Sequence, residues 1–137
     1  MYKTRSKYNS IIKIRLADIL LLKAEAYVET GNLQAAAALV NTVRNRAKLE
    51  DLPATTVSSK EKMADAVLNE RRLELAFEGQ RWFDLVRTGK VFSVLNSLNT
   101  RDSGRLPMTP VTEETVLLPI PQTQIDKNPN LTQNKGY

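Results

Sequence analysis

The sequence predicts an all-α fold. Apolar residues recur at three- and four-residue spacing over long stretches between residues 15 and 88. Gly and Pro are sparse until the last third of the chain and aromatic residues are few, which favours helices over a many-turned β fold. A length of 137 residues suits one domain with its own core. We therefore expect a single domain, with an extended lead-in over 1–14, helices over 15–98 and a loop and extended segment over 99–137.

The composition excludes several classes of function. The chain has no Cys and no His, which removes disulfides, thiolate zinc sites, cysteine nucleophiles and the commonest general base. It has no apolar run of about 18 residues and no signal-peptide pattern behind Met1. A net charge of +5 permits an acidic partner without requiring one. We expect no catalytic residue, no cofactor and no metal site.

Two helices are expected to form a hairpin, over residues 15–30 and 33–49. Two apolar stripes run side by side on the first helix, so we expect it to be buried on more than one side. The stripes are Leu16, Ile19, Leu20, Lys23 and Tyr27, and beside them Ala17, Leu21, Ala24 and Val28. Gly31 suits a left-handed helix end, and Asn32 suits the cap of the second helix. Four consecutive alanines in the second helix allow close helix approach, and the short link predicts an αα-hairpin.

A third helix is expected over 60–78. The segment before it reads as a loop because Pro53 blocks a helix, and Ser58 or Ser59 is suited to cap the helix start. Gly79 is expected to end it.

A fourth helix is expected over 80–88, with Gly89 as its stop and one or two further turns in "VFSVLNSL". Beyond Asn99 the sequence becomes rich in Gly, Ser and Pro and reads as a loop. Pro119 and Pro121 bias their surroundings to extended geometry, before one helical turn around 122–126 and a turn at Asn128-Pro129.

The segment "LNERRLELAFEGQRWFDLVRTGK", residues 68–90, has four Arg and four acidic residues around the only Trp of the chain. Paired carboxylates can hydrolyse glycosides, but one of them must stay protonated, and here every acid has an Arg within a few positions. A nucleic-acid site needs uncompensated positive charge, whereas the four Arg of this segment are balanced by its four acids. We favour an architectural ion-pair lattice, in which the arginines lie close to the acids and away from solvent. The arginines are Arg71, Arg72 and Arg81, and the acids are Glu70, Glu74, Glu78 and Asp84. Phe77 and Trp82 are expected to pack into the core beneath them.

Sugar binding commonly uses exposed aromatic faces. The candidates are Tyr2, Tyr8, Trp82 and Tyr137. Trp82 lies on the apolar side of its helix, where core packing is the favoured interpretation, and Tyr27 is also expected in the core. The tyrosines near the termini are uninformative because exposure there is common.

Four stretches of the chain resemble known families. "AYVETGNLQAAAALVNTV" resembles the middle of one tetratricopeptide repeat, through Ala26, Tyr27, Gly31 and Ala36. "IRLADILLLKAEAYVETGN" followed by "ALVNTVRNRAKL", then "NERRLELAFEGQRWFDLVRTGK", and last "LLPIPQTQIDKNPNLTQNKGY" resemble blocks of the SusD/RagB family in the family's order. Together these blocks cover most of the chain from Arg15 to Tyr137.

The resemblance implies an α-rich, tetratricopeptide-like piece of a bacterial outer-membrane lipoprotein. Members of this family bind glycans, pair with a SusC-like TonB-dependent transporter in oligosaccharide uptake, and are not enzymes. The chain is expected to be the C-terminal part of a longer, lipid-anchored, cell-surface protein of Bacteroidetes, whose signal peptide and anchor lie outside it. The matched motifs belong to the scaffold, so no glycan-contact residue is carried onto this sequence.

Two other functions stay open at this point. One is a free-standing helical-repeat module that binds a protein or peptide, and the other is a basic nucleic-acid binder, suggested by a pI near 9.6. A SusC-like transporter gene beside the coding sequence distinguishes glycan uptake from both. Steep loss of affinity with salt identifies a nucleic-acid binder. The balance of four Arg and four acids in residues 68–90 argues against this function.

Overall fold

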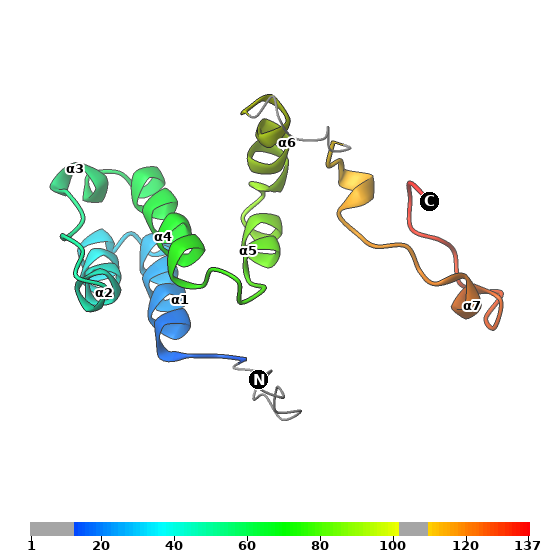
Figure 1. The fold of residues 1–137 in the computed structure, drawn as a ribbon, viewed down its shortest axis with the longest axis horizontal. Coiled ribbons are helices and arrows are strands. Elements are labelled where there is room, and N and C mark those ends of the chain that lie inside the picture. The colour runs from blue at the N-terminus through cyan, green and yellow to red at the C-terminus, as the bar shows by residue number, and fades with distance from the viewer. Residues whose placement is uncertain (1–12, 102–109) are drawn as a thin grey trace, which may run out of the picture. The chain divides into compact units, whose positions relative to one another are not determined.

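A computed structural model describes residues 13–101 and 110–137 of the chain (Figure 1). These residues form α-helices and one short 3-10 helix, and no strand occurs among them, which confirms the all-α prediction. The chain divides into two compact units between Arg81 and Trp82. The expectation of one domain over 1–137 stays a prediction.

The first unit begins with a helical hairpin. Helix α1 (Leu16–Glu29) and helix α2 (Leu33–Arg46) are joined by a turn in which Gly31 has φ +81°. The Asn32 side chain accepts a hydrogen bond from the Ala35 N–H at 3.3 Å and caps α2. Both helices and the roles of Gly31 and Asn32 are as the sequence predicts.

Helix α4 (Lys60–Glu74) packs on both helices of this hairpin. Ser59 caps it, as expected, by accepting a hydrogen bond from the Lys62 N–H. The three helices enclose one aliphatic core, whose buried members are Leu21, Ala24, Val28, Ala36, Ala37, Val40, Val43, Met63 and Val67. The loop expected before α4 contains a short helix, α3 (Ala54–Val57). Pro53 precedes that helix as its N-cap, a place where the missing N–H of proline does no harm.

Helix α4 ends at Glu74, four residues before the predicted end. The Glu74 carbonyl accepts a hydrogen bond from the Arg15 guanidinium, and the Glu78 N–H bonds instead to the Leu75 carbonyl at 3.1 Å. A side chain from 59 residues away therefore takes the carbonyl that a continuing helix would use. Residues 75–79 form a turn, in which Phe77 has φ +66° and Gly79 has φ +79°.

Three expectations about burial are wrong. Phe77 is fully exposed and Trp82 is 39% exposed, so neither packs into the core as predicted. For Phe77 the reason is the early helix end, because the turn directs this residue away from the face that α4 buries. On α1, Leu16 is 73% and Ile19 is 48% exposed, so the helix is buried along one stripe and not on several sides.

The second unit contains α5 (Arg81–Arg87), which begins at the division, α6 (Val91–Arg101), a 3-10 helix η1 (Glu113–Thr115) and α7 (Gln122–Ile125). Gly89, with φ +69°, separates α5 from α6 as predicted. Helix α6 has 11 residues and is longer than the one or two turns expected. The Asn96 amide holds the segment after residue 109 to α6 by bonding the N–H and the carbonyl of Val111, at 2.8 and 3.0 Å.

The C-terminal segment is held by side-chain amides. Gln133 accepts a hydrogen bond from the Ile120 N–H at 2.8 Å and donates one to the Ile120 carbonyl at 2.9 Å. Asn134 donates to the Leu118 carbonyl at 2.6 Å. The helical turn predicted around 122–126 is confirmed by α7.

Candidate functional site

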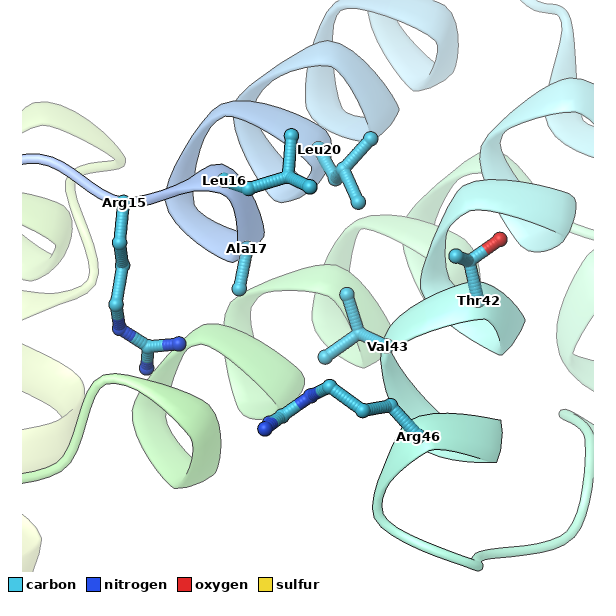
Figure 2. Close-up of a pocket in the computed structure, with 7 residues that line it drawn as sticks. All are labelled: Arg15, Leu16, Ala17, Leu20, Thr42, Val43 and Arg46. Atoms are coloured by element: carbon cyan, nitrogen blue, oxygen red, sulfur yellow. The ribbon is translucent and has the colours of Figure 1, made fainter.

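The ends of α1, α2 and α4 meet in a cluster of four charged residues, Arg15, Arg46, Glu74 and Glu78, called here the charge cluster. Glu74 lies at its centre, where it accepts hydrogen bonds from Arg15 at 2.5 Å and from Arg46 at 2.6 Å. Glu78 accepts two hydrogen bonds from the Arg15 Nε, both at 3.0 Å. In Figure 2, Arg15 at the start of α1 and Arg46 near the end of α2 both extend toward α4. The cluster therefore joins α1, α2 and α4.

The guanidinium of Arg15 is the most heavily used group of the charge cluster. Its hydrogen bonds to Glu78 and then to Glu74 raise the pKa of Arg15 above its ordinary value, against the opposing effect of burial. An arginine is charged at every physiological pH. The pairing of Arg15 with the two carboxylates therefore introduces no pH switch.

Two more ion pairs attach α4 to the hairpin. Arg71 donates to the Asp18 carboxylate of α1 at 2.8 Å, and both side chains are almost fully buried. Arg44 of α2 donates to Glu70 at 2.9 Å and also to the Glu50 carbonyl at 2.8 Å. Each pair links two helices, so the charges of the first unit fix the angles between helices.

The arrangement is suited to architecture and not to acid–base chemistry. Glu70, Glu74 and Glu78 each accept hydrogen bonds from at least one arginine. A glycoside hydrolase needs one carboxyl that gives up a proton and a second one as its partner, whereas all three acids here are engaged by arginine side chains. Across residues 13–101 and 110–137, no three His, Cys, Asp or Glu side chains gather in a way that could hold a metal ion.

Several charged residues of 68–90 pair with residues outside that stretch. Arg15 and Arg46 bind Glu74, Arg44 binds Glu70, and Asp18 binds Arg71. All four partners come from α1, from α2 or from the residue before α1. Only Asp18 leaves a sequence signal, because it stands three residues before Leu21 on the buried stripe of α1. An acid on an apolar stripe indicates a buried basic partner.

The arginines of the stretch behave differently from one another. Arg71 is buried as expected, whereas Arg72 is exposed and donates to the Asn69 side chain at 3.0 Å instead of lying beside an acid. Arg72 stands one position further round α4, on its solvent side, which explains the difference. Arg81 reaches back along its own unit and donates to the Leu68 carbonyl at 3.3 Å. Arg87 binds the buried Asp84 at 2.8 Å.

The aromatic candidates for sugar binding do not assemble into a site. Tyr2 and Tyr8 lie outside the described residues, and Tyr137 is 55% exposed near the end of the chain. Tyr27 is half-buried on α1, with the Lys23 ammonium 5.6 Å from its ring centre.

A groove of about 450 Å³ lies between α1 and α2 (Figure 2). Seven residues line it: Arg15, Leu16, Ala17, Leu20, Thr42, Val43 and Arg46. Its walls are aliphatic, and the two arginines at its end already bind Glu74.

Residues 1–137, the whole chain, match the SusD family. The chain belongs to the SusD family. A relative from Formosa agariphila, SusD-like protein P38, is 37% identical over 134 residues, which are 93% of this chain and 25% of that protein. The starch-binding protein SusD of Bacteroides thetaiotaomicron is 33% identical over 123 residues, 90% of this chain and 21% of its own length.

A solved structure agrees with this placement in the SusD family. The surface glycan-binding protein A from Bacteroides thetaiotaomicron superposes with a TM-score of 0.74 at 30% identity, covering 93% of this chain and 25% of that one. The charge cluster and the helical hairpin thus lie in a segment that corresponds to about a quarter of the relatives' length. None of the helices in the described residues is both long enough and apolar enough to cross a membrane.

Proposed function

We propose that the full-length protein to which this chain corresponds is a cell-surface glycan-binding protein of the outer membrane, not an enzyme. In this proposal it delivers oligosaccharides to a SusC-like TonB-dependent transporter. The observation that supports it is membership in the SusD family, in which two relatives are named for binding starch and surface glycan. The segment described here acts as scaffold, because its charges hold helices together.

The geometry supports the binding part of this proposal over hydrolysis. The three acids on α4 and the turn after it are engaged by arginines. A protein that carries a glycan to a transporter needs a stable frame and has no need of a proton donor. The ion pairs between helices supply that frame.

Binding is tested with the full-length protein and a panel of soluble polysaccharides. Native gels cast with one polysaccharide each are expected to retard the protein for at least one member of the panel, and titration calorimetry then gives the affinity. Serum albumin in the same gels controls for non-specific retardation. Retardation by no polysaccharide, together with tight binding of duplex DNA that weakens steeply with salt, contradicts the proposal.

The transporter partnership needs a separate measurement. Affinity purification of the tagged full-length protein from detergent-solubilised outer membranes is expected to recover a TonB-dependent transporter encoded beside its gene. Deletion of the gene is expected to slow growth on the glycan that the protein binds, while growth on the free monosaccharide is unchanged. Equal growth of the deletion strain and its parent on that glycan contradicts the uptake role.

A further inference from the structure

Helix α4 ends earlier than its local sequence favours. Leu75, Ala76 and Glu78 are strong helix formers. Gly79 after them suits a left-handed helix end, so local preference favours a helix that continues to Glu78. The structure has a turn there instead, with Phe77 at φ +66° and its side chain fully exposed. The turn holds a residue with a Cβ in the left-handed region, which costs free energy.

The guanidinium of Arg15 holds this turn in place. In a continued helix, the Glu78 N–H would bond to the Glu74 carbonyl. The Arg15 guanidinium occupies that carbonyl, and the Glu78 N–H bonds to the Leu75 carbonyl at 3.1 Å. Arg15 also donates to the carboxylates of Glu74 and Glu78. One side chain therefore supplies the contacts that favour the turn over another turn of helix.

Arg15 itself stands outside α1, and its side chain extends toward α4 (Figure 2). Its backbone is extended, with φ −136° and ψ 163°, and its side chain makes no capping hydrogen bond to α1. The buried core of the first unit begins at Leu21, so Arg15 is not one of its members. Arg15 can therefore leave Glu74 without loss of the core, while Arg46 remains on the Glu74 carboxylate.

We propose that the last turn of α4 has two states and that Arg15 selects between them. With the guanidinium on Glu74, α4 is short and the turn forms, as in this structure. With the guanidinium displaced, the helix continues to Glu78 and Phe77 leaves the left-handed region. Phe77 and Leu73 then stand one turn apart on the same face of α4.

The two states differ in where the chain leaves α4. The short helix ends at Glu74, whereas the long helix continues along its axis for about 6 Å more, the rise of four residues. Since Arg15 directly precedes α1, a movement of the chain that enters α1 changes the position of the chain that leaves α4. This coupling operates whichever ligand the protein binds.

Hydrogen exchange of the full-length protein, read by mass spectrometry, tests the two states. Arg15→Gln removes the guanidinium from the Glu74 carbonyl, and Arg46→Gln is the control because Arg46 bonds to the Glu74 carboxylate. Both are made together with Glu78→Gln, since glutamates four residues apart repel each other in a longer helix. We expect the amides of residues 76–78 to exchange at least about tenfold more slowly in the Arg15→Gln variant than in the control.

A further substitution separates the two states from a loss of stability. Phe77→Gly, added to the Arg15→Gln variant, is expected to restore fast exchange, because glycine suits the turn and disfavours the helix. If Arg15 only stabilises the fold, its removal makes the whole first unit exchange faster. Unchanged or faster exchange at residues 76–78 therefore overturns the proposal, as does slow exchange that Phe77→Gly leaves in place. An Arg15→Gln variant that does not fold also overturns it, because displacement of Arg15 must leave the core intact.

Discussion

At the scale of single residues, Asp18 and Arg71 form an ion pair that is almost closed to water. Their side chains are 10% and 3% exposed, and the guanidinium and carboxylate atoms are 2.8 Å apart. We expect Asp18→Ala to lower the free energy of unfolding by about 3–5 kcal/mol, because it leaves the buried guanidinium without this carboxylate. Thermal or urea unfolding of the purified protein measures the loss.

An exposed ion pair on the same helix serves as the control. Glu29 accepts a hydrogen bond from Lys60 at 2.7 Å, with side chains 66% and 52% exposed. Glu29→Ala is expected to cost no more than about 1 kcal/mol, since water screens this pair. If Asp18→Ala is as mild as Glu29→Ala, the buried pair does not hold α4 to α1.

Phe77 carries backbone strain at the end of α4. Its φ of +66° lies in the left-handed region, which a residue with a Cβ adopts at a cost and glycine adopts freely. We expect Phe77→Gly to be about 1–2 kcal/mol more stable than Phe77→Ala, because both lose the ring and only glycine relieves the strain. Urea unfolding of the two variants side by side gives the difference.

The opposite order is expected at Asp65, an exposed position inside α4. There Asp65→Gly should be about 0.5–1 kcal/mol less stable than Asp65→Ala, because glycine loses more backbone freedom in a helix. An alanine advantage at both positions would falsify the strained turn at Phe77.

At the scale of elements, the alanines of α2 let α1 and α4 approach it. Ala36 is 0% exposed, whereas Ala38, two residues on, is exposed. We expect Ala36→Leu to destabilise the protein by about 1–3 kcal/mol, because the added carbons have no space in the core. Ala38→Leu is expected to stay within about 0.5 kcal/mol of the parent. Equal melting temperatures for the two variants contradict the close packing of this hairpin.

The positions and the starts of the helices can be predicted from the sequence because the interactions that set them are local. Gly31, Asn32 and Ser59 act on neighbours within three residues, and apolar spacing fixes the buried stripe of each helix. The end of α4 is not readable in this way. It depends on Arg15, which is 59 residues from Glu74 and meets it only after the helices have packed.

The same distinction applies to the candidate site. The charged stretch suggests ion pairs, and its glutamates are paired, but with Arg15, Arg44 and Arg46 from outside the stretch and not with the arginines predicted within it. The identity of those partners follows from the packing of α1 and α2 against α4, which local spacing does not encode. The exposed stripe of α1 was predicted as buried because the sequence pattern records that a face is apolar, and not which part of the protein covers it.

At the scale of the whole molecule, the paired acids lead to a prediction about activity. We expect the full-length protein to release no new reducing ends from a polysaccharide that it binds, because Glu70, Glu74 and Glu78 are engaged by arginines. A reducing-sugar assay with an active glycoside hydrolase as positive control measures this. Cleavage that Glu74→Gln abolishes, without a change in melting temperature, contradicts the architectural role of the charge cluster.

The amide of Gln133 has a consequence for the solubility of the C-terminal segment. An extended segment with unpaired N–H and carbonyl groups is a template on which a strand from another molecule can pair and start an aggregate. At Ile120 both groups are already bonded to Gln133, and the Leu118 carbonyl is bonded to Asn134. A foreign strand therefore finds these positions occupied, although Leu118 beside them is 81% exposed. Two side-chain amides thus leave fewer backbone groups of this apolar, extended stretch open to intermolecular β-pairing.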